Sequence, residues 1–120
     1  AEMYASSSDI EPGTVVVFGG SAEVVSSAVD ADAMVAGVVS TNPAYLMNDN
    51  INAQHSVAVA LLGRVPTKVV GPVRRGQMLV STFNGHARAE DNPQMGTVIG
   101  KALEDFNGEQ GVIEVVIGRL

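Results

Sequence analysis

The sequence predicts a compact all-β module, a β-sandwich or barrel-like fold of about eight to nine short strands with at most one helical turn. Apolar residues make up 46% of the 120 residues and aromatic residues only 4%. Valine is abundant, and its branched side chain favours strands over helices. Residues 56–81 show the pattern most clearly, because two apolar runs that end at glycine or proline are followed by a turn and another strand.

The chain is long enough for one domain with a real hydrophobic core. Residues 1–12 are polar and rich in serine, which predicts an N-terminal arm or linker. Residues 13–120 are expected to form a single β domain. The chain has no cysteine, so neither a disulfide scaffold nor a thiolate metal site is available to it.

The first half of this domain begins with a predicted hairpin, in which Gly19-Gly20 separates strands at 14–18 and 23–26. Residues 29–33 then connect to a buried strand at 34–40, where Gly37 marks a bulge or a close approach of two backbones. Asn42-Pro43 favours at most one helical turn, through Tyr45, Leu46 and Met47, and residues 48–54 are expected to form a loop.

The second half contains the strongest hairpin signal of the chain. Asn84-Gly85 tolerates the positive φ angles of a type I′ turn and separates residues 82–83 from 86–89. The last two strands are predicted at 97–103 and 111–117, with Asn107-Gly108 as a turn between them. No internal repeat of 20 to 50 residues is found.

Thirteen acidic and seven basic residues give a formal net charge of −6. This charge repels phosphate groups, so no nucleic acid and no anionic membrane is expected as a partner. No apolar run approaches the ~20 residues of a membrane span, and the first residues do not resemble a signal peptide, so we expect a soluble chain.

No pattern of residues predicts a catalytic site, a metal site or a cofactor site. His55 and His86 lack a carboxylate at ligand spacing and are interpreted as surface imidazoles. The remaining polar candidates are interpreted as solvated or turn residues: Gly19-Gly20-Ser21 as a hairpin turn, Asp30 with Asp32 and Glu104 with Asp105 as loop charges, and Arg74-Arg75 as a charged turn. The methionines Met34, Met47, Met78 and Met95 are expected to fill gaps in the core.

Several predicted strands are apolar at nearly every position rather than alternating. Such strands must be covered on both faces, by a second layer or by neighbouring subunits. In a chain of this size the pattern predicts oligomerisation.

Landmarks in fixed order resemble a known family. They are residues 36–44 (AGVVSTNPA), 59–66 (VALLGRVP), 68–73 (KVVGPV), 75–80 (RGQMLV) and 99–104 (IGKALE). They resemble the C-terminal domain of bacteriophage tail-fibre and appendage proteins, related to the intramolecular-chaperone, autoproteolytic peptidase G2 family and found in cyanophage virion proteins. The resemblance implies a β-rich homotrimer that acts through contacts with itself and other virion proteins.

The same landmarks are also similar to small head-decoration proteins of tailed phages, which cement capsid subunits as trimers. Both resemblances imply a location in the virion and a structural rather than an enzymatic role. The autoproteolysis of some family members leaves a third hypothesis, a self-cleaving endopeptidase with its nucleophile or acid among Ser8, Asp9 and Glu11. A sugar-binding tip is disfavoured because the aromatic residues Tyr4, Phe18, Tyr45, Phe83 and Phe106 are few and scattered.

Overall fold

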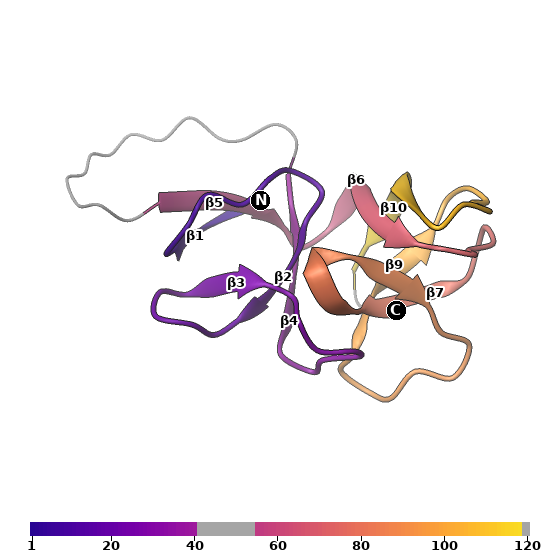
Figure 1. Cartoon of the computed structure of the whole chain (residues 1–120), viewed down its shortest axis with the longest axis horizontal. Coiled ribbons are helices and arrows are strands. Elements are labelled where there is room, and N and C mark those ends of the chain that lie inside the picture. Colours follow the sequence, from indigo (N-terminus) through magenta and orange to yellow (C-terminus); the bar gives the residue numbers. More distant parts are fainter. Residues whose placement is uncertain (41–54, 119–120) are drawn as a thin grey trace.

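The computed structural model describes residues 1–40 and 55–118, and within them the predicted all-β class is confirmed. Ten strands form two closed five-stranded sheets, which lie next to each other along the longest axis of the molecule (Figure 1). The N-terminal barrel holds β1 (Glu2–Ser6), β2 (Val15–Phe18), β3 (Val24–Ser26), β4 (Val35–Val39) and β5 (His55–Ala60). The C-terminal barrel holds β6 (Gly63–Val70), β7 (Met78–Ser81), β8 (Ala87–Ala89), β9 (Val98–Ala102) and β10 (Gln110–Ile117), with a 3-10 turn at Phe83–Gly85.

Both barrels have the same strand order. In each barrel the first strand lies between the third and the fifth, the second lies between the third and the fourth, and the fourth pairs with the fifth. The first and third strands are parallel in both barrels, and every other pair is antiparallel. The chain is therefore a tandem repeat of one five-stranded barrel.

A constant spacing of 63 residues relates equivalent positions in the first four strands. The parallel pair is Ser6 with Val24 in one barrel and Val69 with Ala87 in the other. The register shift in the second strand follows the same rule, since it falls between Val16 and Val17 in β2 and between Leu79 and Val80 in β7. Only four positions in residues 1–40 carry the same residue 63 positions later, so the repeat is nearly invisible in the sequence.

The apolar strands of the N-terminal barrel are buried on both faces. One set of side chains, Val16, Val24, Val39, Val57 and Val59, fills the inside of this barrel. Val15, Val38 and Ala60 instead belong to a cluster with buried residues of the C-terminal barrel. The second layer that the sequence requires is thus supplied by the same chain, and the apolar strands do not by themselves require a partner subunit.

The prediction of an N-terminal arm is wrong for Glu2–Ser6. These residues form β1, which pairs with β5 at five successive positions, from Glu2 with Val59 to Ser6 with His55. Pairing satisfies the backbone groups of a polar segment and does not require it to be apolar. This additional strand is one reason why ten strands are observed where eight to nine are predicted.

Local predictions are confirmed at the turns. β2 and β3 pair antiparallel around Gly19-Gly20, and β7 and β8 pair antiparallel around Asn84-Gly85, where φ is 58° and 70°. Gly37 lies against the backbone of Ala60, as a close approach requires. The predicted helical turn at Asn42-Pro43 and the loop at 48–54 lie outside the described residues.

Candidate functional site

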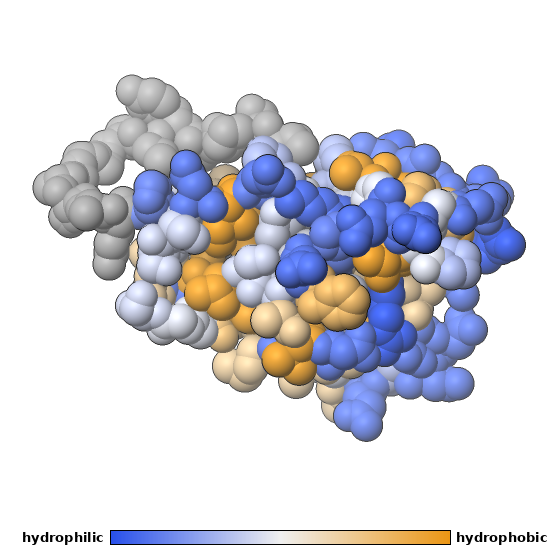
Figure 2. Space-filling view, in the orientation of Figure 1, coloured by the Kyte–Doolittle hydropathy of each residue, from blue (hydrophilic) through white to orange (hydrophobic). Residues whose placement is uncertain are grey.

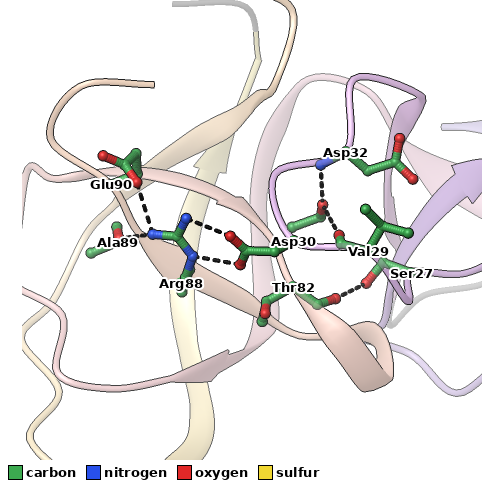
Figure 3. A network of polar contacts seen from close by, with 9 residues as sticks. Ser27, Val29, Asp30, Asp32, Thr82, Arg88, Ala89 and Glu90 are labelled. Atoms are coloured by element: carbon green, nitrogen blue, oxygen red, sulfur yellow. Dashed lines mark hydrogen bonds and ion pairs between the residues drawn. The ribbon is translucent and has the colours of Figure 1, made fainter. Parts of the chain in front are cut away.

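The two barrels are joined by a polar contact that we call the sealed contact, formed by residues 27–32 of the first barrel and 81–88 of the second. Its centre is a two-pronged ion pair, in which Nε and Nη2 of Arg88 donate to the two carboxylate oxygens of Asp30 at 2.6 and 2.8 Å. Nη1 of Arg88 donates to Glu90 at 2.9 Å from the other side (Figure 3). A guanidinium held by two carboxylates fixes orientation as well as distance.

Short polar side chains complete the sealed contact. The backbone N–H of Ala31 donates to the carbonyl of Ser81 at 2.8 Å, and the N–H of Asp32 donates to the Ser81 hydroxyl oxygen at 2.9 Å. The Ser81 hydroxyl in turn donates to the carbonyl of Val29 at 3.0 Å (Figure 3). The hydroxyl of Ser27 donates to the carbonyl of Thr82 at 2.6 Å. Ser27, Ser81 and Thr82 are buried, so these bonds satisfy polar groups that water does not reach.

The electrostatics of the contact follow from Arg88. Hydrogen bonding to its guanidinium holds the pKa of Asp30 below its ordinary value, although partial desolvation acts in the opposite direction. The same group lowers the pKa of Glu90, and both carboxylates raise the pKa of Arg88. All three groups are therefore charged at neutral pH. Asp30 remains a half-exposed loop charge, as expected from the sequence, and in addition it is paired with Arg88.

A second polar link joins the barrels on another side. The Lys68 ammonium donates to a carboxylate oxygen of Glu11 at 2.6 Å and lowers the pKa of that carboxyl group. The backbone N–H of Lys68 donates to the carbonyl of Gly13 at 2.9 Å. Polar links at two places and a shared apolar cluster therefore join the two barrels.

A groove with a volume of about 1020 Å³ lies between the barrels; most of its lining residues are apolar, and we call it the apolar groove. Its walls come from three parts of the chain: Tyr4, Phe18, Ala33, Val35, Ala36, Gly37 and Leu61 of the N-terminal barrel and linker; Met78, Val98, Ile99, Ile117 and Gly118 of the C-terminal barrel; and the loop Asp91–Gly96. Asp91 is the only charged residue among the described residues of this lining. The ring of Phe18 packs edge-on against Tyr4 and is 41% exposed.

Three exposed large apolar side chains of the described residues line this groove, namely Phe18, Leu61 and Met95. Met95 is 96% exposed at the rim of the groove, and Met34, which is adjacent in sequence to two lining residues, is 55% exposed. The prediction that these two methionines fill gaps in the core is therefore wrong. On the face shown in Figure 2, hydrophobic residues lie over the N-terminal barrel and near its junction with the second, whereas hydrophilic residues cover the outer end of the C-terminal barrel. A gathering of this kind is typical of an interaction surface.

The repeat explains where the groove comes from. In the sealed contact, loop residues 29–32 of the first barrel cover Ser81 and Arg88 of the second. The equivalent loop of the second barrel is formed by residues 92–95. It faces Phe18 across the groove, and Phe18 is the repeat equivalent of Ser81. Among the described residues no hydrogen bond joins loop 92–95 to the N-terminal barrel. The groove is thus the open counterpart of the sealed contact.

Charge is divided unequally between the two halves of the chain. Residues 1–62 contain seven acidic residues and no lysine or arginine, a formal charge of −7. Residues 63–120 contain all seven basic residues and six acidic ones, a formal charge of +1. Both ion pairs between the barrels therefore take their cation from the second half of the chain and their carboxylate from the first. These pairs are Arg88 with Asp30 and Lys68 with Glu11.

The remaining candidates from the sequence do not converge on one site. Nδ1 of His55 lies 3.4 Å from a carboxylate oxygen of the exposed Asp9, whereas Nδ1 of His86 lies 2.8 Å from the carbonyl of Asn84. Asp105 accepts a hydrogen bond from the backbone N–H of Arg75, which lies in the predicted turn. In residues 1–40 and 55–118, no group of three or more histidine or acidic side chains could hold a metal ion.

Ser8, Asp9 and Glu11, the candidates for self-cleavage, lie between β1 and β2. The backbone N–H of Ser8 donates to the hydroxyl oxygen of Ser6 at 3.2 Å, and Asp9 is next to His55. Glu11 is held as a carboxylate by Lys68, which disfavours it as a proton donor at neutral pH. The three residues therefore have separate partners.

Comparison with known proteins leaves the family open. Neither the protein-family models nor the curated proteins that were searched contain a match to this chain. No helix in the part of the chain described by the structure is long and apolar enough to cross a membrane.

Proposed function

We propose that the chain is a structural protein of a bacteriophage virion, a β module of a fibre or appendage that acts through oligomeric protein–protein contacts. The order of sequence landmarks supports the family. The single observation that carries a binding role is the apolar groove with its exposed rim, because large apolar side chains are costly to leave in water and mark contact surfaces when they gather.

The contacts between the barrels suit this role. A module that transmits force or sets the spacing between subunits needs fixed geometry, and the links Asp30–Arg88 and Glu11–Lys68 hold the two barrels in one orientation. The acidic first half supports solubility of a chain that occurs in many copies. A homotrimer is the expected assembly, with other virion proteins as further partners.

Mass spectrometry and immunogold labelling of purified phage particles test this proposal. We expect peptides of this chain in particles of the phage that encodes it, and antibodies to the chain should label fibres or appendages. Labelling of the head would favour the alternative, a capsid decoration protein. Particles that lack the chain would overturn a virion function.

The contact between Asp9 and His55, next to Ser8, gives the self-cleavage alternative one specific observation. A longer precursor should then release a fragment with a new terminus near residue 8. The Ser8→Ala and His55→Ala variants should both prevent this cleavage. A precursor that stays intact after assembly would exclude the alternative.

A further inference from the structure

We propose that the apolar groove binds a second copy of this chain, with the loop Asp91–Gly96 and its tip residue Met95 of one copy inserted into the groove of the next. The proposal rests on the proposed function for the expectation of a homo-oligomer. It assigns the contact that builds this oligomer.

The sealed contact shows what kind of segment covers the position equivalent to the groove. In the sealed contact, a loop of one barrel lies across the second-strand residue Ser81 of the other. The groove offers the equivalent residue, Phe18, and in residues 1–40 and 55–118 no loop is hydrogen-bonded across it. A loop from another copy supplies the missing cover, and loop 91–96 is the repeat equivalent of the loop that does so within the chain.

The shape of the surface favours the same occupant. Met95 is 96% exposed, the most exposed large apolar side chain among the described residues, and lies directly beside a hollow of about 1020 Å³. A projecting apolar residue beside an apolar hollow makes the surface complementary to itself. Methionine is flexible and adapts to irregular cavities, which suits it to such insertion.

Charge also favours a second copy at this place. Two copies that each carry a net charge of −6 repel one another overall, most strongly where their acidic first halves approach. In the part of the chain that the structure describes, the groove lining contains one charged residue, Asp91, so this face allows two copies to approach with little repulsion. The donor loop forms one wall of the acceptor groove, so both lie on the same face of the chain, and a head-to-tail arrangement of these faces is what a ring such as the expected trimer requires.

Analytical ultracentrifugation of the full chain over a range of concentrations tests the contact. We expect a reversible oligomer, and Met95→Lys should raise its dissociation constant by at least about tenfold. Ala33→Trp, which fills the groove from within, should weaken association similarly. Val112→Lys is the matched control, since Val112 is 59% exposed outside the groove and its replacement should leave association unchanged. Circular dichroism should show that all three variants fold.

Cysteine cross-linking identifies the partner surfaces, because the chain has no cysteine of its own. A tagged Met95→Cys chain mixed with an untagged Ala33→Cys chain should form a mixed disulfide under mild oxidation. A Val112→Cys chain mixed with Ala33→Cys should not. A wild-type monomer at all concentrations, or equal cross-linking in both mixtures, would overturn the contact.

The outcomes separate this inference from the proposed function. A monomeric chain that is still found in particles would refute the second copy as occupant and leave the virion role intact. If Met95→Lys then blocked incorporation, the groove would bind a different virion protein. An oligomer built through Met95 in a chain absent from particles would support the contact and refute the virion function.

Discussion

Gly37 and Gly100 occupy the same position in the two barrels. Each lies in the fourth strand opposite the irregularity in the second, Gly37 facing Val16 and Gly100 facing Leu79. Each also lies against the backbone of the fifth strand, so that a methyl group would overlap the carbonyl of Ala60 in one case and of Val116 in the other. The repeat thus preserves a packing constraint where most of the side chains have changed.

Replacing Gly100 by alanine should destabilise the fold. The added methyl group would meet backbone atoms of β10, which cannot move aside without breaking the pairing with β9. Overpacking of this kind costs roughly 1–3 kcal/mol. Urea denaturation should show a lower midpoint for Gly100→Ala. The neighbouring exposed residue gives the control, because Lys101→Ala should change stability by less than about 0.5 kcal/mol; equal stability of both variants would contradict the close approach.

Replacing Asp30 by asparagine should weaken the sealed contact. The substitution removes one of the two carboxylates that hold Arg88, while the side chain keeps its size. Because Asp30 is partly exposed, solvent screening limits the loss to about 1 kcal/mol. Chemical denaturation at low and high salt measures this loss, with Glu109→Gln, at an exposed position just before β10, as a charge-matched control. A loss no greater than that of the control would show that the ion pair contributes nothing.

Stability should decrease in acid. The pKa values of Asp30, Glu90 and Glu11 are lower in the folded chain than their ordinary values, because Arg88 and Lys68 hold the charged forms. These carboxylates therefore contribute to the free energy of unfolding at pH values above about 4, where they are ionised in the unfolded chain as well. This contribution is lost as the pH falls through their lower pKa values in the folded chain. Thermal unfolding between pH 7 and pH 2 should show this decrease. The Arg88→Met variant should show a smaller one, and an identical pH profile would exclude Arg88 as its cause.

Val59→Asp should unfold the N-terminal barrel. Val59 is completely buried among valines, and a carboxylate there would lack a partner, which costs several kcal/mol. Loss of assembly in this variant would follow from loss of the fold, so assembly itself is better tested at exposed positions. Amide hydrogen exchange should show reduced protection in β2 and β5, and native protection there would contradict the core described above.

The fold class and the turns could be predicted because they depend on local chemistry. Glycine at Gly19-Gly20 and Asn84-Gly85 permits positive φ wherever the surrounding residues lie. β1 could not be predicted, since its pairing with β5 depends on backbone bonds between segments some 50 residues apart in the chain. The tandem repeat was equally inaccessible, because the barrels keep shape and register rather than residue identity.

The candidate site could be predicted only in part. Asp30 stands out in the sequence as a carboxylate, but its partner Arg88 lies 58 residues away and is brought to it only by the contact between the barrels. The signal that could have indicated this link is the absence of any lysine or arginine before Gly63. Met95 looked like a core residue, and only the packing of the two barrels shows that it projects into solvent.

Cryo-electron microscopy of the phage particle tests the central claim most directly. The account predicts double barrels of the size seen here, about 43 × 24 × 23 Å, arranged around a symmetry axis of a fibre or appendage, with each groove filled by the Met95 loop of a neighbouring copy. A particle in which no double barrel occurs, or in which isolated double barrels leave their grooves open to solvent, would contradict it.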